Sequence, residues 1–157
     1  LIVGHWPVSA YHDIPCVNPY LHKNHVLSID GGNMTKTFGQ INVVDLSSGL
    51  KVYRYDALVA YRCLEDQSSV QEFNYLAFPK TEIKLLDHDE ALILYRGQKI
   101  KVQKGDYYTW RSRYFLYDQN DYLLDVKSGD IIYKVHDNLF KKDGIVGRYL
   151  KKSTLIA

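Results

Sequence analysis

Short runs of β-branched and aromatic residues follow one another along most of this 157-residue chain. In the second half they are separated by Gly, Asp and Asn and recur about every 8 to 12 residues, a spacing typical of all-β sandwiches and small barrels. No segment of convincing length shows the apolar period of an amphipathic helix. The clearest runs are TEIKLLDHD, ALILYRGQKIKVQ, YYTWRSRYFLYD, YLLDVKSGDIIYKVHD and GIVGRYL. The sequence therefore predicts a mainly β protein.

The first quarter of the chain combines a short apolar run with a long irregular segment. Residues 1–3 are wholly apolar and end at glycine, as expected for the end of a strand buried on both faces. Residues 7–24 hold three prolines and show no regular period, which indicates an irregular loop, and long loops are commonly functional. Because the chain opens inside an apolar run without an initiator methionine, we expect it to be part of a longer protein.

A polar segment, LEDQSSV at residues 64–70, interrupts the β-like runs. Before it, residues 25–30, 39–46 and 50–63 are rich in strand-forming residues and are separated by the turn signals GGN and SSG. We place a domain boundary at this segment, which predicts one domain over residues 1–63 and a second, all-β domain over residues 64–157.

The net charge limits which partners the protein can bind, and the number of cysteines indicates its cellular compartment. The net charge is only +2 and the Lys and Arg residues are scattered, so we expect neither nucleic acid nor a membrane as partner. No transmembrane run or signal peptide is recognisable. Cys16 and Cys63 are too few for a disulfide scaffold, which favours reduced thiols and a cytoplasmic location.

His5 is the first candidate for a functional residue. It follows the apolar run directly, and Gly4 before it allows a tight turn, so a rigid strand would aim the imidazole at a metal ion. For a bare Gly-His pair, a packed histidine hydrogen-bonded to the backbone is the more common arrangement.

The Gly4–His5 pair belongs to an ordered series of sequence blocks, which are GHWPV, NP, VLSIDGGN and GQINVV. Over residues 1–46 they resemble the C-terminal part of bacterial metallophosphoesterases of the serine/threonine protein phosphatase and diadenosine-tetraphosphatase-like type. The resemblance implies the last β-layer of an α/β sandwich that holds two divalent metals, Mn, Fe or Zn, and it implies that His5 is one metal ligand.

The family's other ligand motifs and its catalytic histidine are absent from these 157 residues. The resemblance therefore implies a fragment of a phosphoester hydrolase that holds no catalytic residue of its own and is inactive alone. It also implies that the missing N-terminal catalytic part, or self-association, covers the apolar strands.

Five further residues accompany His5 as site-lining or structural candidates, namely Gly4, Trp6, Tyr11, Asp30 and Gly31. Asp30 precedes Gly31, and an Asx turn is favoured there over a role as metal ligand. Trp6 and Tyr11 flank His5 and are candidates to line a phosphate pocket, although packing is the more common role of such aromatics. A zinc site is the less favoured alternative, and it would use His12, Cys16, His22 and His25.

The second half is similar to a bacterial SH3-like barrel over residues 123–150, where Gly129 and Asp130 would form a hairpin turn and Gly144 and Gly147 would flank the last hairpin. Tyrosines and Trp110 concentrate between residues 107 and 133. Cross-strand packing is the plainer explanation, and an aromatic groove for an extended peptide is the alternative. The competing function is therefore a non-enzymatic β-rich binding or regulatory module for a peptide, a glycan or a neighbouring domain.

Overall fold

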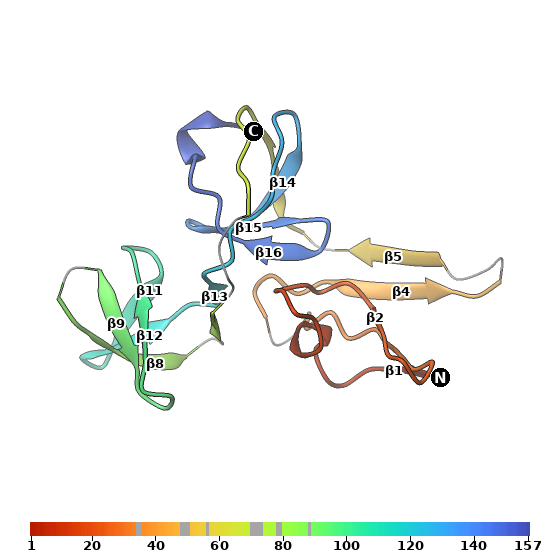
Figure 1. Ribbon diagram of the computed structural model, residues 1–157, viewed down its shortest axis with the longest axis horizontal. Helices are drawn as coiled ribbons and strands as arrows, with labels where there is room; N and C mark the ends of the chain where they lie inside the picture. The colour runs from red at the N-terminus through yellow and green to blue at the C-terminus, as the bar shows by residue number, and fades with distance from the viewer. Residues whose placement is uncertain (34–35, 48–50, 56, 70–73, 78–79, 88) are drawn as a thin grey trace.

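The computed structural model describes residues 1–33, 36–47, 51–55, 57–69, 74–77, 80–87 and 89–157. The chain is 45% strand and 4% helix, in several antiparallel sheets, which confirms the prediction of a mainly β protein (Figure 1). Within these ranges the helical residues form two short 3-10 turns, η1 (Val8–Ala10) and η2 (Lys152–Thr154).

The N-terminal part consists of a small sheet and a projecting ribbon. The sheet has the order β1-β3-β2, and β1 runs parallel to β3. Next to it, β4 and β5 form a two-stranded antiparallel ribbon, and β4 lies on the side of β1 and β2 (Figure 1). The strands are β1 (Ile2–Val3), β2 (Tyr20–Leu21), β3 (Leu27–Ser28), β4 (Ile41–Asp45) and β5 (Lys51–Tyr55).

A five-stranded antiparallel sheet, here called the central sheet, has the order β10-β9-β8-β12-β11. Its strands are β8 (Thr81–Leu85), β9 (Glu90–Ile93), β10 (Gln98–Lys101), β11 (Tyr107–Trp110) and β12 (Arg113–Leu116). Alternate residues such as Ile83, Ile93 and Leu116 point inward into one apolar cluster. This alternation is what the period-2 pattern of the sequence requires.

A second five-stranded antiparallel sheet, here called the C-terminal sheet, has the order β16-β15-β14-β6-β17. Its strands are β6 (Val59–Cys63), β14 (Ile131–His136), β15 (Leu139–Lys142), β16 (Ile145–Gly147) and β17 (Leu155–Ile156). The pair β7 (Leu76–Ala77) and β13 (Gln119–Asn120) completes the strands. Because β6 pairs with β14 and β17, the strand just before the expected domain boundary belongs to a sheet built mostly from the C-terminal residues. The boundary itself stays a prediction.

The turn expected at Gly129 and Asp130 forms but does not close a hairpin, and in the last hairpin Gly144 lies in the turn while Gly147 ends β16. Asp143 and Gly144 have φ of 50° and 77° and join β15 to β16 as a two-residue hairpin turn. Gly129 lies in a turn with φ of 94°, and the Asp130 N–H donates to the Lys127 carbonyl. The residues before that turn do not pair with β14; Val126 instead bridges to Gln67.

A buried polar network joins the central and C-terminal sheets. Arg148, just after β16, places its Nη2 3.0 Å from Asp106 Oδ2 and 2.9 Å from Gln119 Oε1. Its Nε donates to the Asn120 carbonyl. Asp106 is fully buried. Arg148 also donates to the Tyr75 hydroxyl. Burial of that hydroxyl raises the pKa of Tyr75 to about 12. A buried ion pair satisfied this completely holds its neighbours in one arrangement.

A second buried ion pair ties the N-terminal part to the central sheet. Lys36 Nζ lies 3.2 Å from Asp118 Oδ1, and both side chains are fully buried. Burial lowers the pKa of Lys36 although Asp118 acts in the opposite direction. The Thr37 N–H donates to the other oxygen of Asp118 at 2.6 Å. Three parts of the chain are thus held together by charged groups that the sequence separates widely.

Replacing Arg148 tests this network. Arg148→Ala leaves the Asp106 carboxylate buried without its cation, so we expect a loss of about 3–5 kcal/mol in the free energy of unfolding. Arg113→Ala, which breaks the exposed ion pair with Glu82, serves as control and should cost less than about 1 kcal/mol. Urea denaturation followed by circular dichroism measures both. Equal losses in the two variants would contradict a structural role for the buried pair.

His136 makes stability depend on pH. Its Nε2 donates to the Asp118 carbonyl at 2.7 Å and its Nδ1 accepts from the Asn138 N–H, a pattern that requires the neutral ring. Burial lowers the pKa of His136 below the usual 6.5. Since the unfolded chain then binds the proton more readily, stability should fall as pH drops below about 6.5.

Urea denaturation of the wild type and two variants between about pH 5.5 and 7.5 measures this dependence. His136→Gln keeps a donor but cannot titrate, and it should flatten the profile. His25→Gln, which changes an exposed histidine, should leave the profile unchanged. A wild-type slope retained in His136→Gln would assign the effect to another group.

Candidate functional site

The segment from Gly4 to Pro7 forms a short outward loop at the carboxyl end of β1. On one side of it, the Ile29 N–H donates to the Val3 carbonyl at 3.0 Å; on the other, the Val8 N–H donates to the Asp30 carbonyl at 2.8 Å. Both ends of the loop are therefore anchored to the strand that runs parallel to β1. Carboxyl ends of parallel strands are a common place for functional loops.

His5 stands in this loop in a strained conformation. Its φ is 81°, in the left-handed region that glycine tolerates and other residues enter at a cost of order 1–2 kcal/mol. Its side chain is exposed and makes no hydrogen bond or ion pair within the described part of the chain. Non-glycine residues in such conformations concentrate at functional sites.

Asp30 and Gly31 have structural explanations. The Gly32 N–H donates to Asp30 Oδ1 at 2.8 Å, which is the hydrogen bond of an Asx turn. A Cβ on Gly31 would lie 2.1 Å from the Gln40 carbonyl oxygen, and one on Gly39 would lie 2.3 Å from the Gly32 carbonyl oxygen. The IDGG and GQ blocks of the sequence thus allow two backbone segments to approach more closely than any side chain permits.

An amide and lysine cluster fixes the residue 7–24 loop beneath the site. Asn42 Nδ2 donates to the Val17 and Ile29 carbonyls, both at 3.0 Å. Gln40 Nε2 donates to Asn42 Oδ1 at 2.8 Å, and the buried Lys141 donates to Gln40 Oε1 at 3.3 Å. Backbone carbonyls that strands would otherwise satisfy are paired with side chains here, so the loop has a defined course without regular structure.

The two aromatic candidates, Trp6 and Tyr11, have different surroundings. Trp6, next to His5, is 60% exposed. Tyr11 stacks on Tyr20 with ring centroids 5.9 Å apart and meets the edge of His22 at 4.7 Å. Tyr11 therefore belongs to an aromatic cluster of the residue 7–24 loop, while Trp6 extends the exposed surface at His5.

The histidines of that loop already have hydrogen-bond partners. His12 Nε2 is 2.9 Å from the Asn18 carbonyl, and His22 Nε2 is 2.8 Å from Ser28 Oγ. Cys16 and Cys63 are buried and are not joined by a disulfide. Across the described ranges, no three His, Cys, Asp or Glu side chains gather as a metal site requires. Among these residues, the structure thus does not assemble the alternative zinc site.

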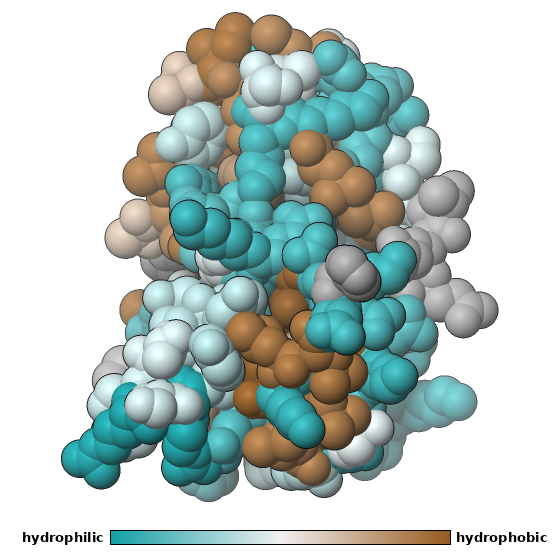
Figure 2. Space-filling model, turned by 90° about the vertical axis from the view of Figure 1, so that its left-hand side faces the viewer, coloured by the Kyte–Doolittle hydropathy of each residue, from teal (hydrophilic) through white to brown (hydrophobic). Residues whose placement is uncertain are grey.

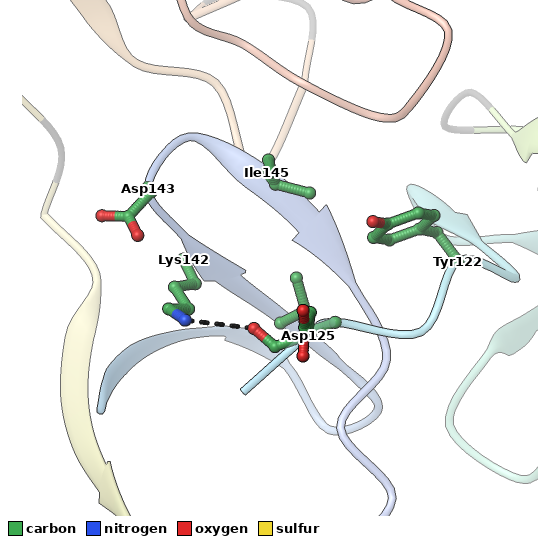
Figure 3. A pocket seen from close by; sticks show the side chains of 6 residues that line it. Tyr122, Asp125, Lys142, Asp143 and Ile145 are labelled. Carbon is green, nitrogen blue, oxygen red and sulfur yellow. Dashed lines mark hydrogen bonds between the residues drawn. The ribbon is translucent and has the colours of Figure 1, made fainter. Parts of the chain in front are cut away.

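One surface hollow of about 230 Å³ lies between the β15–β16 hairpin and residues 122–125 (Figure 3). Lys142 reaches into it and donates to the Asp125 carbonyl at 3.1 Å, while its Nζ lies 2.6 Å from Asp130 Oδ2. The hydrogen bond from Lys142 holds the pKa of Asp130 below its usual value. The Lys142 ammonium is therefore held in structural contacts at this hollow.

The sequence analysis did not predict that several ionisable residues are buried. Lys36, Asp106, Asp118, Lys141 and Arg148 are all buried, whereas charged residues are mostly exposed in proteins. Their partners lie tens of residues away, so no local pattern marks them. Each satisfies backbone or side-chain groups within the fold, which makes them structural residues.

Substituting His5 tests whether its strained backbone opposes stability. His5→Gly removes the steric cost of the left-handed conformation, and we expect the free energy of unfolding to rise by about 0.5–1 kcal/mol. His5→Ala retains that cost and should change stability little. Urea denaturation of the two variants decides; a destabilised His5→Gly protein would show that the imidazole packs against the fold instead.

Among the described residues, no helix is long and apolar enough to cross a membrane. Comparisons of the chain with models of known protein families, with curated proteins and with solved structures found no match.

Proposed function

We propose that this chain is the C-terminal part of a bacterial, metal-dependent phosphoester hydrolase of the serine/threonine protein phosphatase type, and that His5 supplies one of its metal ligands. The observation that carries the proposal is the strained, exposed and unpartnered His5 at the carboxyl end of β1, within the described residues. The order of the GHWPV, IDGG and GQINVV blocks supports it.

The local construction suits a ligand that must be held still. The loop around His5 is closed on both sides by backbone hydrogen bonds to β3 and the residues after it, and the Asx turn at Asp30 fixes the neighbouring strand end. Rigid elements of this kind keep a functional side chain in position. The neutral imidazole has a lone pair for a divalent cation, and Mn, Fe and Zn all accept it.

The exposed surface around β1 supports a partner on that side. Leu1 is 82% exposed and Ile2 is 39% exposed, although β1 belongs to a parallel pair, which proteins normally bury on both faces. Trp6 and Leu21 add exposed apolar surface to the same small sheet and its loop. We therefore assign this face to the remaining catalytic part of the enzyme, or to a second copy of the chain.

When two divalent ions are bound, they would orient a water molecule as nucleophile and neutralise the phosphoryl oxygens. The chain's own contribution is limited to holding His5 in place, because its other residues do not complete such a centre. The second, all-β part is proposed to be an SH3-like accessory domain, supported by the β14–β15–β16 meander with its Asp143–Gly144 turn. We infer that the chain alone is inactive.

The first test uses p-nitrophenyl phosphate with added Mn²⁺. The purified 157-residue chain should release no p-nitrophenol above the buffer rate, because one imidazole cannot hold both ions. Turnover by this chain alone would contradict the proposed division of ligands.

The second test isolates the protein from its source cells through an affinity tag, with metal analysis and mass spectrometry of every co-purifying polypeptide. We expect about two metal ions per active assembly, and His5→Ala should lower kcat by about 100-fold or more and reduce the metal content. His25→Ala is the matched control, because His25 is also exposed and has φ of 61°. A native assembly without metal and without phosphatase activity would overturn the proposal.

A further inference from the structure

The outer face of the central sheet carries a row of aromatic side chains. Tyr108 stacks on its cross-strand neighbour Phe115 with centroids 5.8 Å apart, and it contacts Tyr117 at 5.0 Å. Trp110 meets Phe115 at 6.0 Å. The alternate residues of the same strands, including Tyr107, Tyr114 and Leu116, pack against the core on the inner face. The outer row is therefore additional to the aromatic residues that the core uses.

These aromatic residues enclose a hollow of about 360 Å³. Tyr108, Trp110 and Phe115 line it together with Lys80, and Trp110 is 53% exposed. The hollow is large enough for one leucine-sized or aromatic side chain. Figure 2 views the side of the molecule that faces left in Figure 1, where the central sheet lies, and shows apolar surface gathered in its lower part beside hydrophilic side chains.

Two cations lie at the hollow. Lys80 lines it, and the Arg111 guanidinium lies over the Trp110 ring. Arg113 lies over the Phe115 ring but pairs with Glu82, so this second arginine adds no net charge. The excess of cations favours an anionic ligand. It also disfavours a second copy of the same face, because two such surfaces would repel each other.

The edge of the sheet beside the hollow is open. β11 is the last strand in its sheet, and the Tyr117 N–H donates to the Asp106 carbonyl just before β11 begins. The antiparallel pattern then directs the N–H and C=O groups of Tyr107 and Thr109 away from β12. Within the described ranges no strand pairs with this edge. An extended polypeptide is the ligand whose backbone matches such an edge.

The β11–β12 turn retains strain. Arg111 and Ser112 have φ of 48° and 60°, a two-residue hairpin turn that normally uses Asn and Gly. The Arg111 guanidinium lies over the Trp110 ring, 4.5 Å from its centroid. The strained turn thus places the Arg111 guanidinium beside Trp110, which lines the hollow. Strained backbone of this kind is common at binding sites.

We propose that the central sheet binds an extended acidic peptide, which adds to β11 as a further strand, places one apolar side chain in the Trp110 hollow and directs carboxylates toward Lys80 and Arg111. Residues two apart in a strand share a face, so the matching peptide has an acidic residue two positions before and after the apolar one. The inference is independent of the proposed phosphatase function.

Fluorescence anisotropy with a labelled peptide Ser-Glu-Thr-Leu-Thr-Glu-Ser tests the proposal. We expect saturable binding that weakens as salt is raised, because carboxylates meet exposed cations. Trp110→Ala and Lys80→Glu should each weaken binding by about tenfold or more. Trp6→Ala and Tyr95→Ala are matched controls, since both change exposed aromatic residues elsewhere, and both should leave the affinity unchanged. Urea denaturation confirms that each variant is folded.

Two altered peptides separate this binding mode from others. Replacing both Glu by Lys should abolish binding, and replacing both Thr by Pro should do the same, because proline removes the backbone donors of an added strand. Protection of the Thr109 amide from hydrogen exchange on adding the peptide would locate the strand at β11. The proposal is overturned by an absence of saturation up to about 1 mM peptide. It is overturned equally by an unchanged affinity in Trp110→Ala, or by tighter binding of oligothymidylate or of a chitin oligosaccharide.

Discussion

The buried ion pair between Asp106 and Arg148 is the contact on which the arrangement of the two large sheets depends. Removing two charges from water is costly, and the fold offsets that cost only because every partner is in place. Asp106 also accepts from the Gln103 N–H and from Asn138 Nδ2, and Arg148 also reaches Gln119 and the Asn120 carbonyl. Since these groups come from both sheets and the strands between them, a shift of one sheet against the other would leave a charge unpaired. The pair therefore selects one relative placement.

The residues of the IDGG and GQ blocks divide into two kinds. Asp30, Gly31 and Gly39 serve the backbone: an Asx turn and two approaches too close for a Cβ. The His5 side chain makes no hydrogen bond or ion pair within the described residues, and its backbone has a strained φ of 81°. The proposed ligand function therefore rests on this residue together with the order of the sequence blocks around it.

The central sheet shows how one set of strands serves two purposes. Its inner face fills the core through residues such as Ile83 and Leu116, while its outer face carries Tyr108, Trp110 and the buried Phe115. Because side chains alternate along the strand, changing the exposed Trp110 need not disturb the core. A binding surface can thus be built on this sheet without loss of the packing that holds it.

The sequence alone determined the mainly β class, a turn at Gly129 and Asp130 and the largely irregular course of residues 7–24, because alternation, turn chemistry and proline act over a few neighbouring residues. It also singled out His5 as a candidate, because Gly4 and an apolar run precede it. The tertiary structure decided the rest. The pairing of β6 with β14, the bridge of Val126 to Gln67 and the buried pairs Lys36–Asp118 and Asp106–Arg148 join residues far apart in the chain. Such contacts depend on which sheet faces meet, and a local pattern carries no information about that choice.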